Sequence, residues 1–487
     1  MSTESTIDTT GPGEVSDGPG VRTGPLIALL VCAAFVVILN ETIMGVALPD
    51  LMIEFSVPAT TAQWLTTAFL LTMAIVIPIS GWLLTRLPLR TVFVIAMGSF
   101  AVGTLLAGLA PVFGVLVVAR VVQAVGTALM MPLLMTTILN VVPAERRGRM
   151  MGIVSIVISV APAIGPTISG VVLDQLSWRW MFWLVLPIAL IALVAGAIKV
   201  RNVTEPTQAP LDVISVVLSA FAFGGLIYGL SSIGESATGH TPVPPWIPLV
   251  VGTLALATFI WRQLGLGSRA LLDLRAFSTP TFSVAVLLVA VSMMALFGTL
   301  ILLPIYLQTA LGLSTLATGL MLLPGGLVMG LLAPVVGGLF DRLGPRPLVA
   351  PGAFATCLAL WGMTTFGTGT GQGTVIAAHV LLSAGLAFMF TPLLTSALGS
   401  LPHELYSHGS AIVGTVQQVA GAAGTALFVT VMTRTSAASA KDGAEEMTSV
   451  ADGVHAALMW GGIISATAVV LALFVRRPRP VVVPEAL

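Results

Sequence analysis

Residues 315–346 read TLATGLMLLPGGLVMGLLAPVVGGLFDRLGPR, and this stretch decides the fold. An apolar run over 315–340 leads directly into a short polar turn, Gly337-Gly-Leu-Phe-Asp-Arg342-Leu-Gly-Pro-Arg346. A helix needs about 20 apolar residues to cross the hydrocarbon core of a membrane. The stretch therefore predicts a membrane-spanning helix that ends in a charged loop.

A second loop of the same kind lies 256 residues earlier, where Gly81-Trp-Leu-Leu-Thr-Arg86-Leu-Pro-Leu-Arg90 follows the apolar run 60–84. Residues 119–126 resemble residues 378–385 at the similar offset of 259. Both matches fall at corresponding ends of apolar runs, so we expect an internal repeat. Chance likeness between Gly- and Leu-rich segments is the alternative interpretation.

The composition of the whole chain agrees with a membrane protein. Only 8% of the 487 residues are charged and 56% are hydrophobic, with a mean hydropathy of +1.04. Soluble domains carry about 25% charged residues, so the chain has too few charges to cover soluble surfaces. The same shortage argues against nucleic-acid binding, which depends on basic side chains that neutralise phosphates.

Apolar runs of spanning length predict an all-α integral membrane protein with fourteen spans, and Lys and Arg positions predict its orientation. Sixteen of the 20 Lys and Arg residues fall on the side of the N-terminus, which predicts cytoplasmic termini and a multi-pass protein of the cell (inner) membrane. The predicted spans are 26–49, 60–84, 91–110, 113–139, 149–173, 180–199, 211–233, 246–263, 281–304, 315–340, 347–366, 374–399, 409–432 and 455–475.

The repeat pairs the first six spans with the last six and leaves two spans between them. Both halves begin on the same side of the membrane, which is the arrangement of a parallel repeat. We therefore expect this organisation: a disordered cytoplasmic tail 1–24, a six-helix bundle 25–200, two extra spans in 201–265, a cytoplasmic linker 266–280, a second six-helix bundle 281–476 and a cytoplasmic tail 477–487.

Two ionisable residues lie deep in predicted spans, Glu41 and Arg120. A charge at the centre of a membrane costs roughly 2.5–3.5 kcal/mol, so its presence indicates a function. Both lie about 12 Å below the predicted outer ends of their helices, and opposite charges at matched depth can share a polar cavity. A carboxyl group shielded from water can exchange protons near neutral pH. We predict that Glu41 couples transport to protons and that Arg120 tunes it, with a structural ion pair as the alternative.

Other candidates are weaker. Gly165, Pro166 and Gly170 in span 149–173 would bend the helix and let a neighbour approach closely. Flexible and aromatic side chains could line a cavity for lipophilic molecules, although plain packing explains any one of them as well. These cavity candidates are Phe35, Ile38, Met44, Met131 and Phe390. We expect no metal site, no disulfide between Cys32 and Cys357, and no ATP-binding loop.

From about residue 26 to 476 the chain resembles the major facilitator superfamily, specifically the fourteen-span drug:proton antiporters of the EmrB/QacA type. The similar elements are Leu39-Asn-Glu41-Thr-Ile-Met-Gly-Val-Ala-Leu-Pro49, Arg120-x-x-Gln123-x-x-Gly126, Gly165-Pro166-x-x-Ser169-Gly170 and Asp341-Arg342-x-Gly344-x-Arg346. The resemblance implies two six-helix bundles around a central cavity, with structural or gating roles for Gln123, Gly126, Gly165, Pro166, Gly170, Asp341, Arg342 and Arg346.

The chain departs from the family pattern at two places. Asn40 stands at the family's aspartate position and the acid follows at Glu41, as in the lincomycin-resistance branch. One residue turns a side chain by about 100° around a helix. The loop after span 60–84 has Thr85 and Pro88 where the pattern has Asp and Gly, whereas the copy after span 315–340 keeps both.

The resemblance implies a proton-coupled multidrug efflux antiporter that works by alternating access. Its expected partners are small lipophilic or cationic substrates, protons and the lipid bilayer, without nucleic acid or an obligate protein partner. It would be no enzyme, and the proton gradient would replace any cofactor as the energy source. The alternatives are an exporter of a single endogenous metabolite or lipid, and a non-transporting membrane receptor or sensor.

Overall fold

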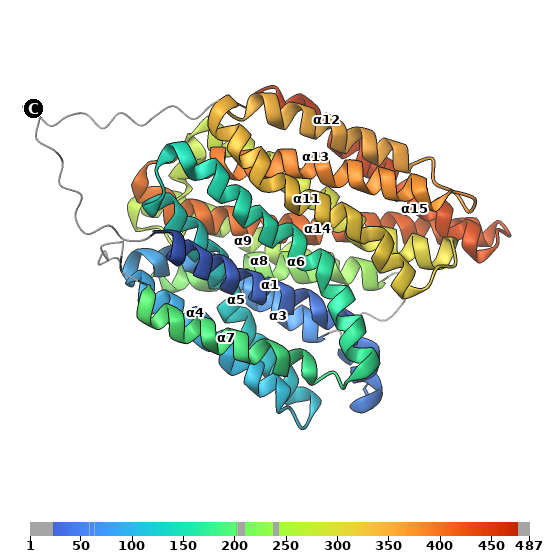
Figure 1. The fold of residues 1–487 in the computed structure, drawn as a ribbon, viewed down its shortest axis with the longest axis horizontal. Coiled ribbons are helices and arrows are strands. Elements are labelled where there is room, and N and C mark those ends of the chain that lie inside the picture. The colour runs from blue at the N-terminus through green and yellow to red at the C-terminus, as the bar shows by residue number, and fades with distance from the viewer. Residues whose placement is uncertain are drawn as a thin grey trace, which may run out of the picture.

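The computed structural model describes residues 23–475, apart from residues 58, 63, 201, 203–209 and 237–242. The predicted tails 1–24 and 477–487 lie outside the described residues, except that residues 23 and 24 already belong to the first helix. Helices make up nearly all of the described chain (Figure 1). They are α1 (Thr23–Glu54), α2 (Ala59–Ala62), α3 (Trp64–Arg86), α4 (Leu89–Gly108), α5 (Phe113–Val141), α6 (Arg147–Gln175), α7 (Trp180–Lys199), α8 (Val213–Ser236), α9 (Trp246–Leu266), α10 (Pro280–Ile305), α11 (Thr315–Leu343), α12 (Arg346–Met363), α13 (Gln372–Gly399), α14 (Tyr406–Lys441) and α15 (Glu446–Ala472).

Each of the fourteen predicted spans coincides with a long helix, but the count of fourteen membrane crossings is not confirmed. Within the described residues, 12 helices are long and apolar enough to cross a membrane. The helices α6 and α12 are not among them. The side chains of residues 159, 163, 166 and 167 of α6 lie outside the described part of the structure, and α12 has only 18 residues and begins with Arg346. The protein is thus an all-helical membrane protein with 12 candidate spans.

Several helices continue beyond their predicted spans. Helix α1 extends to Glu54, α14 extends to Lys441, and α15 begins at Glu446. The sequence analysis ended these spans at polar residues, because polar side chains are costly in lipid. That cost disappears in the aqueous layer beside the membrane, where backbone hydrogen bonds still favour continuation of a helix. The helices therefore lie where the spans were predicted, but these three helices are longer than the predicted spans.

The helices pack in two groups with matching contacts. In the first group α4 packs against α5 and α7, α3 against α5, and α1 against α5, α6 and α7. In the second group α12 packs against α13 and α15, α11 against α13, and α10 against α13, α14 and α15. Replacing each helix of the first group by its repeat partner produces the contacts of the second. The two groups form the lower and upper parts of the molecule in Figure 1.

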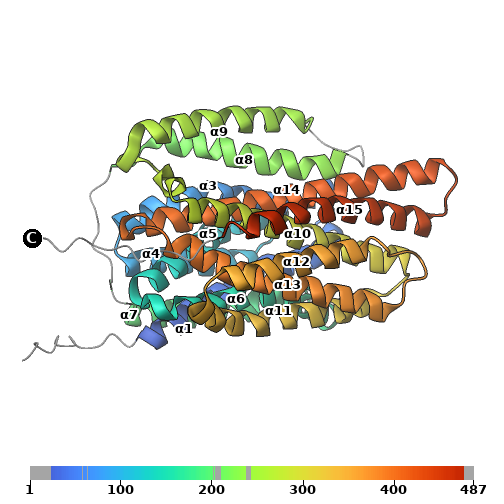
Figure 2. The ribbon, with the colours of Figure 1, turned by 90° about the horizontal axis from the view of Figure 1, so that it is seen from above.

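Two seams join the groups, and they are also repeat partners. Helix α6 packs against α11, and α3 packs against α14; we call these the α6–α11 seam and the α3–α14 seam. The remaining long helices, α8 and α9, pack against each other, and α8 also packs against both α3 and α14. Figure 2 shows this pair as a separate layer above α3 and α14. The pair therefore covers one seam from outside.

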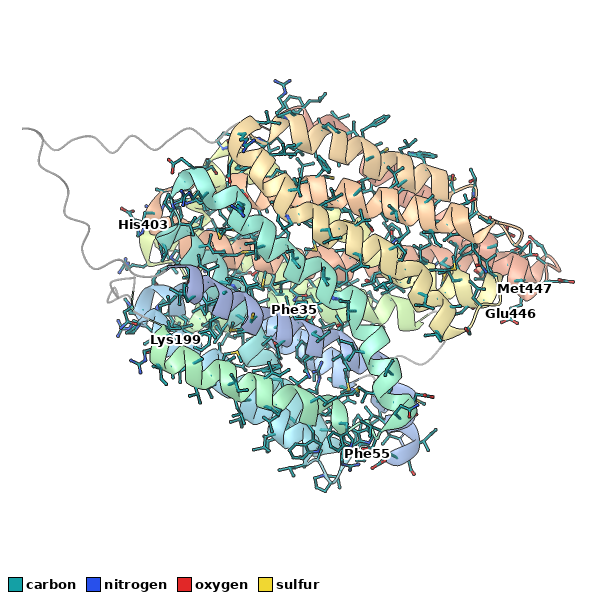
Figure 3. All side chains as sticks on the ribbon, in the orientation of Figure 1. Phe35, Phe55, Lys199, His403, Glu446 and Met447 are labelled. Atoms are coloured by element: carbon teal, nitrogen blue, oxygen red, sulfur yellow. The ribbon has the colours of Figure 1, made fainter. Side chains whose placement is uncertain are left out.

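The long helices run in one common direction, so the molecule has two distinct ends. Figure 3 shows Lys199 and His403 at one end and Phe55, Glu446 and Met447 at the opposite end, with Phe35 between them. The end with Lys199 also contains the C-terminus of α3 at Arg86 and the turn that ends at Arg146. We call it the arginine-rich end.

Candidate functional site

A buried polar cluster lies between α1, α3, α4 and α5. Arg120 and Gln123 are three residues apart on α5, share one face of that helix and are completely buried. Arg120 Nη1 donates a hydrogen bond to Gln123 Oε1 (3.0 Å) and one to Asn40 Oδ1 on α1 (3.2 Å). Gln123 Nε2 donates to Thr104 Oγ1 on α4 (2.9 Å). The cluster thus joins three helices of the first group.

The guanidinium of Arg120 is only partly satisfied. Its Cζ atom lies 4.0 Å from the ring centroid of Phe69 on α3, so the ring covers one face of the cation. Its Nε and Nη2 atoms are buried and have no hydrogen-bond partner among the described residues. Buried donors without acceptors are costly, and a buried cation adds to that cost. The site therefore has unused capacity to bind an acceptor or an anionic group.

Glu41 lies next to this cluster but does not pair with it. The side chain is half-buried, and among the described residues no hydrogen bond or ion pair within 4.0 Å engages its carboxylate. It acts on Arg120 electrostatically, although Arg120 bonds to Asn40, the residue at the family's aspartate position. Because α1 continues to Glu54, Glu41 also lies about 20 Å from the end of its helix rather than the predicted 12 Å. A proton role for Glu41 stays a prediction.

The glycines predicted from the motifs have different surroundings. A Cβ atom at Gly126 would lie 2.3 Å from the Ala96 carbonyl oxygen of α4, and one at Gly165 would lie 2.2 Å from Thr42 Oγ1 of α1. Only glycine permits these approaches. Gly170, by contrast, is exposed, and among the described residues no atom of a neighbouring helix lies within 4 Å of a Cβ atom placed there, so the expected close approach is not seen at this position. Pro166 lies within α6, and its side chain is outside the described part of the structure.

Asp341 lies at the arginine-rich end of the α6–α11 seam. Its carboxylate accepts hydrogen bonds from the backbone N–H groups of Gly148 (2.8 Å) and Arg149 (3.0 Å), in the first turn of α6. Free N–H groups and the helix dipole make the start of a helix attractive to a carboxylate. The neighbouring motif residues Arg342 and Arg346 are exposed. Asp341 therefore fastens the two groups of helices together.

Four further side-chain hydrogen bonds between the groups were missed by the sequence analysis, and one of them joins Gln418 Nε2 on α14 to Met73 Sδ on α3 (3.7 Å). Arg147 Nη1 donates to Tyr406 Oη (3.0 Å), Thr136 Oγ1 to Ser410 Oγ (3.3 Å) and Thr391 Oγ1 to Ser155 Oγ (2.9 Å). The offset of 259 residues aligns Arg147 with Tyr406, so the link between them joins repeat partners and could have been found from the repeat. The hydroxyl pairs carry no such signal, because Ser and Thr are ordinary residues in membrane helices.

The cavity candidates do not form one group. Met44 is buried in a small hydrophobic cluster with Ile43 and Phe182. Phe390 is buried in the main hydrophobic core, and the half-buried Phe35, Ile38 and Met131 pack against that core. Their predicted role in a substrate cavity stays a prediction.

The comparisons with known proteins agree with the helix arrangement. The family model described as Major Facilitator Superfamily matches residues 30–425. The chain is 41% identical over 96% of its length to the lincomycin resistance protein LmrB of Listeria monocytogenes, covering 99% of that protein. It is 39% identical over 93% of its length to the lincomycin resistance protein LmrB of Bacillus subtilis, covering 96% of it.

Solved structures show the same fold at low identity. The crystal structure of the human organic anion transporter MFSD10 (TETRAN) superposes with a TM-score of 0.64 at 13% identity, covering 93% of this chain and 99% of that one. The proton:xylose symporter XylE gives a TM-score of 0.62 at 15% identity, covering 93% and 96%. The paired packing of the two helix groups, the family match and these relatives lead to one conclusion: the chain belongs to the major facilitator superfamily of membrane transporters.

Proposed function

We propose that the protein is a proton-coupled multidrug efflux antiporter that exports amphipathic or cationic drugs, dyes or antibiotics by alternating access. The observation that carries the proposal is Glu41, a half-buried carboxylate without a bonded partner among the described residues, beside the buried Arg120. Relatives at 39–41% identity over nearly the whole chain are named lincomycin resistance proteins, which supports drug export and makes lincosamides the first substrates to test.

The proposal includes the topology. All fourteen long helices would cross the membrane, with both termini in the cytoplasm and with bundles 25–200 and 281–476 moving against each other. The extra spans would lie in 201–265 and the linker in 266–280. The matched contacts of the two helix groups support this division. The basic residues at the arginine-rich end support the orientation, because cytoplasmic loops carry an excess of Lys and Arg.

In the proposed cycle, Glu41 takes up a proton from outside and releases it inside while the substrate leaves. The carboxylate can change its protonation without first breaking an ion pair, because Arg120 bonds to Asn40 and Gln123 instead. A change in the distance between Glu41 and Arg120 would change the proton affinity of the carboxyl group. The bonds that cross the seams at the arginine-rich end would have to break before that end could open.

The test is dye efflux in everted membrane vesicles with an imposed proton gradient. Glu41→Gln keeps the size of the side chain and removes the titrating group, so we expect gradient-driven efflux to fall at least tenfold. Glu54→Gln is the matched control, because it removes a carboxyl group near the end of the same helix. A hydrogen bond from Arg179 (2.6 Å) holds the pKa of Glu54 below its usual range, so this group stays ionised and should not carry protons.

We expect Glu54→Gln to keep efflux within twofold of the parent. Full gradient-driven efflux by Glu41→Gln would reject the proton site while leaving drug export intact. A substrate panel that includes lincomycin separates multidrug export from export of one endogenous compound. Gradient-independent binding without any efflux would instead favour a receptor.

A further inference from the structure

The two seams are repeat partners, yet only one has a loop carboxylate at the arginine-rich end. Asp341 corresponds to Thr85 by the offset of 256 residues, and Gly148 and Arg149 correspond to Ser407 and His408 by the offset of 259. Thr85 has a hydroxyl group in place of the carboxylate, and its Oγ1 donates to the Trp82 carbonyl oxygen of its own helix (2.8 Å). The α3–α14 seam thus lacks a carboxylate at the position where the α6–α11 seam has Asp341.

The first turn of α14 lies next to the segment between α9 and α10, residues 267–279, which we call the segment. The buried ring of His408 lies near the backbone of Leu271 and near Asp273, which acts on the ring electrostatically. Leu271 and Leu272 are buried, so this part of the segment is packed into the protein rather than free in solution. On its other side, His408 lies against α3, since its Cα atom would be 3.4 Å from a Cβ atom at Gly81.

The same segment is fastened to the α8–α9 pair. The side chain of Gln263 on α9 is buried; its Oε1 accepts the Leu272 N–H (3.2 Å), and its Nε2 donates to Ser215 Oγ on α8 (2.7 Å). Arg262 makes two hydrogen bonds to the Asp212 carboxylate, at 2.7 and 2.9 Å. These bonds lower the pKa of Asp212 to about 2, so the pair stays ionised at physiological pH. These hydrogen bonds connect α8 and α9 to the segment, and the His408 ring of α14 lies next to the segment at Leu271.

The α8–α9 pair is itself positioned over the seam. Helix α8 packs against both α3 and α14, and the Tyr228 ring on α8 stacks on Trp64 of α3 with centroids 6.3 Å apart. A Cβ atom at Gly225 would lie 2.9 Å from Gly252 Cα, so α8 and α9 lie in close contact. Figure 2 shows the pair directly above α3 and α14. The α6–α11 seam has no corresponding helix over it among the described residues.

We propose that the α8–α9 pair and the segment after it replace the missing loop carboxylate. They hold the first turn of α14 against α3, as Asp341 holds the first turn of α6 against α11. The repeat thus keeps two fastened seams but fastens them differently: one through a carboxylate in the last turn of α11, the other through an inserted helix pair. This inference concerns the closure of a seam and does not depend on the substrate or the driving ion.

The test uses two buried alanines as matched reporters. Ala411 lies at the α3–α14 seam, where its Cβ would be 3.2 Å from a Cβ at Gly81, and Ala333 lies at the α6–α11 seam beside Gly152. Ala411→Cys and Ala333→Cys are each made in a background with Cys32→Ser and Cys357→Ser. A membrane-impermeant maleimide, added to everted vesicles, measures how often each thiol becomes accessible.

Gln263→Leu removes both amide hydrogen bonds at constant size, which breaks the link between the α8–α9 pair and the segment. We expect labelling of the Ala411→Cys thiol to rise at least fivefold, while labelling of the Ala333→Cys thiol stays within twofold. His408→Leu breaks the other end of the link and should give the same selective rise. It provides the second variant should Gln263→Leu fail to fold, which gel filtration in detergent would show.

The decisive arm restores the carboxylate. Thr85→Asp with Pro88→Gly recreates the loop of the other seam, and in the Gln263→Leu background it should return labelling of the Ala411→Cys thiol to within twofold of the parent. An equal rise at both reporters, or no rise at either, would overturn the proposal. A selective rise that the restored loop leaves unchanged would overturn it as well, because the helix pair would then act in a different way from Asp341.

Discussion

The α6–α11 and α3–α14 seams are built from equivalent helices and yet are held in different ways. In the first, Asp341 of one group bonds directly to two backbone N–H groups of the other. In the second, the contact runs from α14 through the segment after α9 to α8, which lies over both α3 and α14. The repeat therefore preserves the packing of the helices but not the chemistry that fastens them.

This difference has a mechanical consequence. At the α6–α11 seam, separation breaks contacts between helices of the two groups only, including the contact of α6 with α13. The α3–α14 seam can separate only if α8 leaves one of its two neighbours or moves with them. We therefore expect the two seams to resist opening of the arginine-rich end to different degrees. The predictions below compare changes at the two seams, either through dye efflux or through labelling of the two thiol reporters.

The largest effect is expected at the glycines where each seam is tightest. Gly81 and Gly337 are repeat partners, but a Cβ atom at Gly337 would lie 2.2 Å from the Gly148 carbonyl oxygen, whereas one at Gly81 would lie 3.2 Å from its nearest neighbour, Ala411 Cβ. The first distance forces the backbones apart, and overpacking of this kind costs about 1–3 kcal/mol. We expect Gly337→Ala to reduce dye efflux at least tenfold and Gly81→Ala less than threefold, at equal expression.

Equal losses from the two substitutions would contradict the idea that the α6–α11 seam is the tighter contact. Thermal unfolding in detergent serves as the control for general damage. A lower melting temperature for Gly337→Ala with unchanged efflux would show that the added methyl group destabilises the folded protein but does not hinder the movement of the seam.

The sequence predicted the helices of the two seams better than the contacts between those helices. Apolar runs locate the centres of the helices because the cost of polar groups in lipid is large and local. The loop motif likewise identified Asp341 as a residue of interest. Its partners are backbone N–H groups at Gly148 and Arg149, and every residue type except proline has such a group. A sequence motif is a pattern of side chains, so it could not have identified Gly148 and Arg149 as the partners of Asp341.

The polar cluster shows the same limit. Arg120 and Gln123 could be placed on one helix face from their spacing, but the choice between Asn40 and Glu41 as partner depends on how α1 is rotated against α5. A rotation of about 100° separates the two outcomes, and the apolar sequence around them does not fix it. The position of α8 over the α3–α14 seam could not be predicted either. Helices α8 and α9 have no repeat partners within the chain whose positions could be compared with theirs.

The next effect in size is expected at the carboxylate itself. Asp341→Asn keeps the shape of the side chain, but its single oxygen can accept only one of the two backbone hydrogen bonds, and that bond is no longer charge-assisted, a loss of at least about 1.4 kcal/mol. Labelling of the Ala333→Cys thiol should rise about tenfold, and labelling of the Ala411→Cys thiol should stay within twofold. If the Ala411→Cys thiol also became accessible, the two seams would open together. That result would contradict the idea that the two seams are fastened independently.

A smaller effect that is shared by both seams is expected at Tyr406. Its hydroxyl accepts a hydrogen bond from Arg147 (3.0 Å), and this bond joins the starts of α6 and α14, one helix from each seam. A hydrogen bond to a charged group contributes somewhat more than a neutral one, but Tyr406→Phe keeps the ring over which Arg147 lies at 5.4 Å. We expect labelling of both thiols to rise two- to fivefold. A rise at only one of them would assign Tyr406 to that seam alone.

The smallest effect concerns the pH dependence of the covered seam. The bonds from Arg262 lower the pKa of Asp212 from its ordinary value of 3.8 to about 2. A carboxylate whose pKa falls on folding stabilises the folded state above the unfolded pKa, and this contribution disappears only as the pH falls through the folded pKa. The ion pair between Asp212 and Arg262 should therefore be constant from pH 9 to pH 5, and labelling of the Ala411→Cys thiol should change by less than twofold over this range.

Asp212→Asn should raise labelling of the Ala411→Cys thiol only slightly at every pH, because partly exposed ion pairs contribute about 0–1 kcal/mol. A rise beginning near pH 6 would contradict this assignment, since a carboxylate with a pKa near 2 does not titrate there.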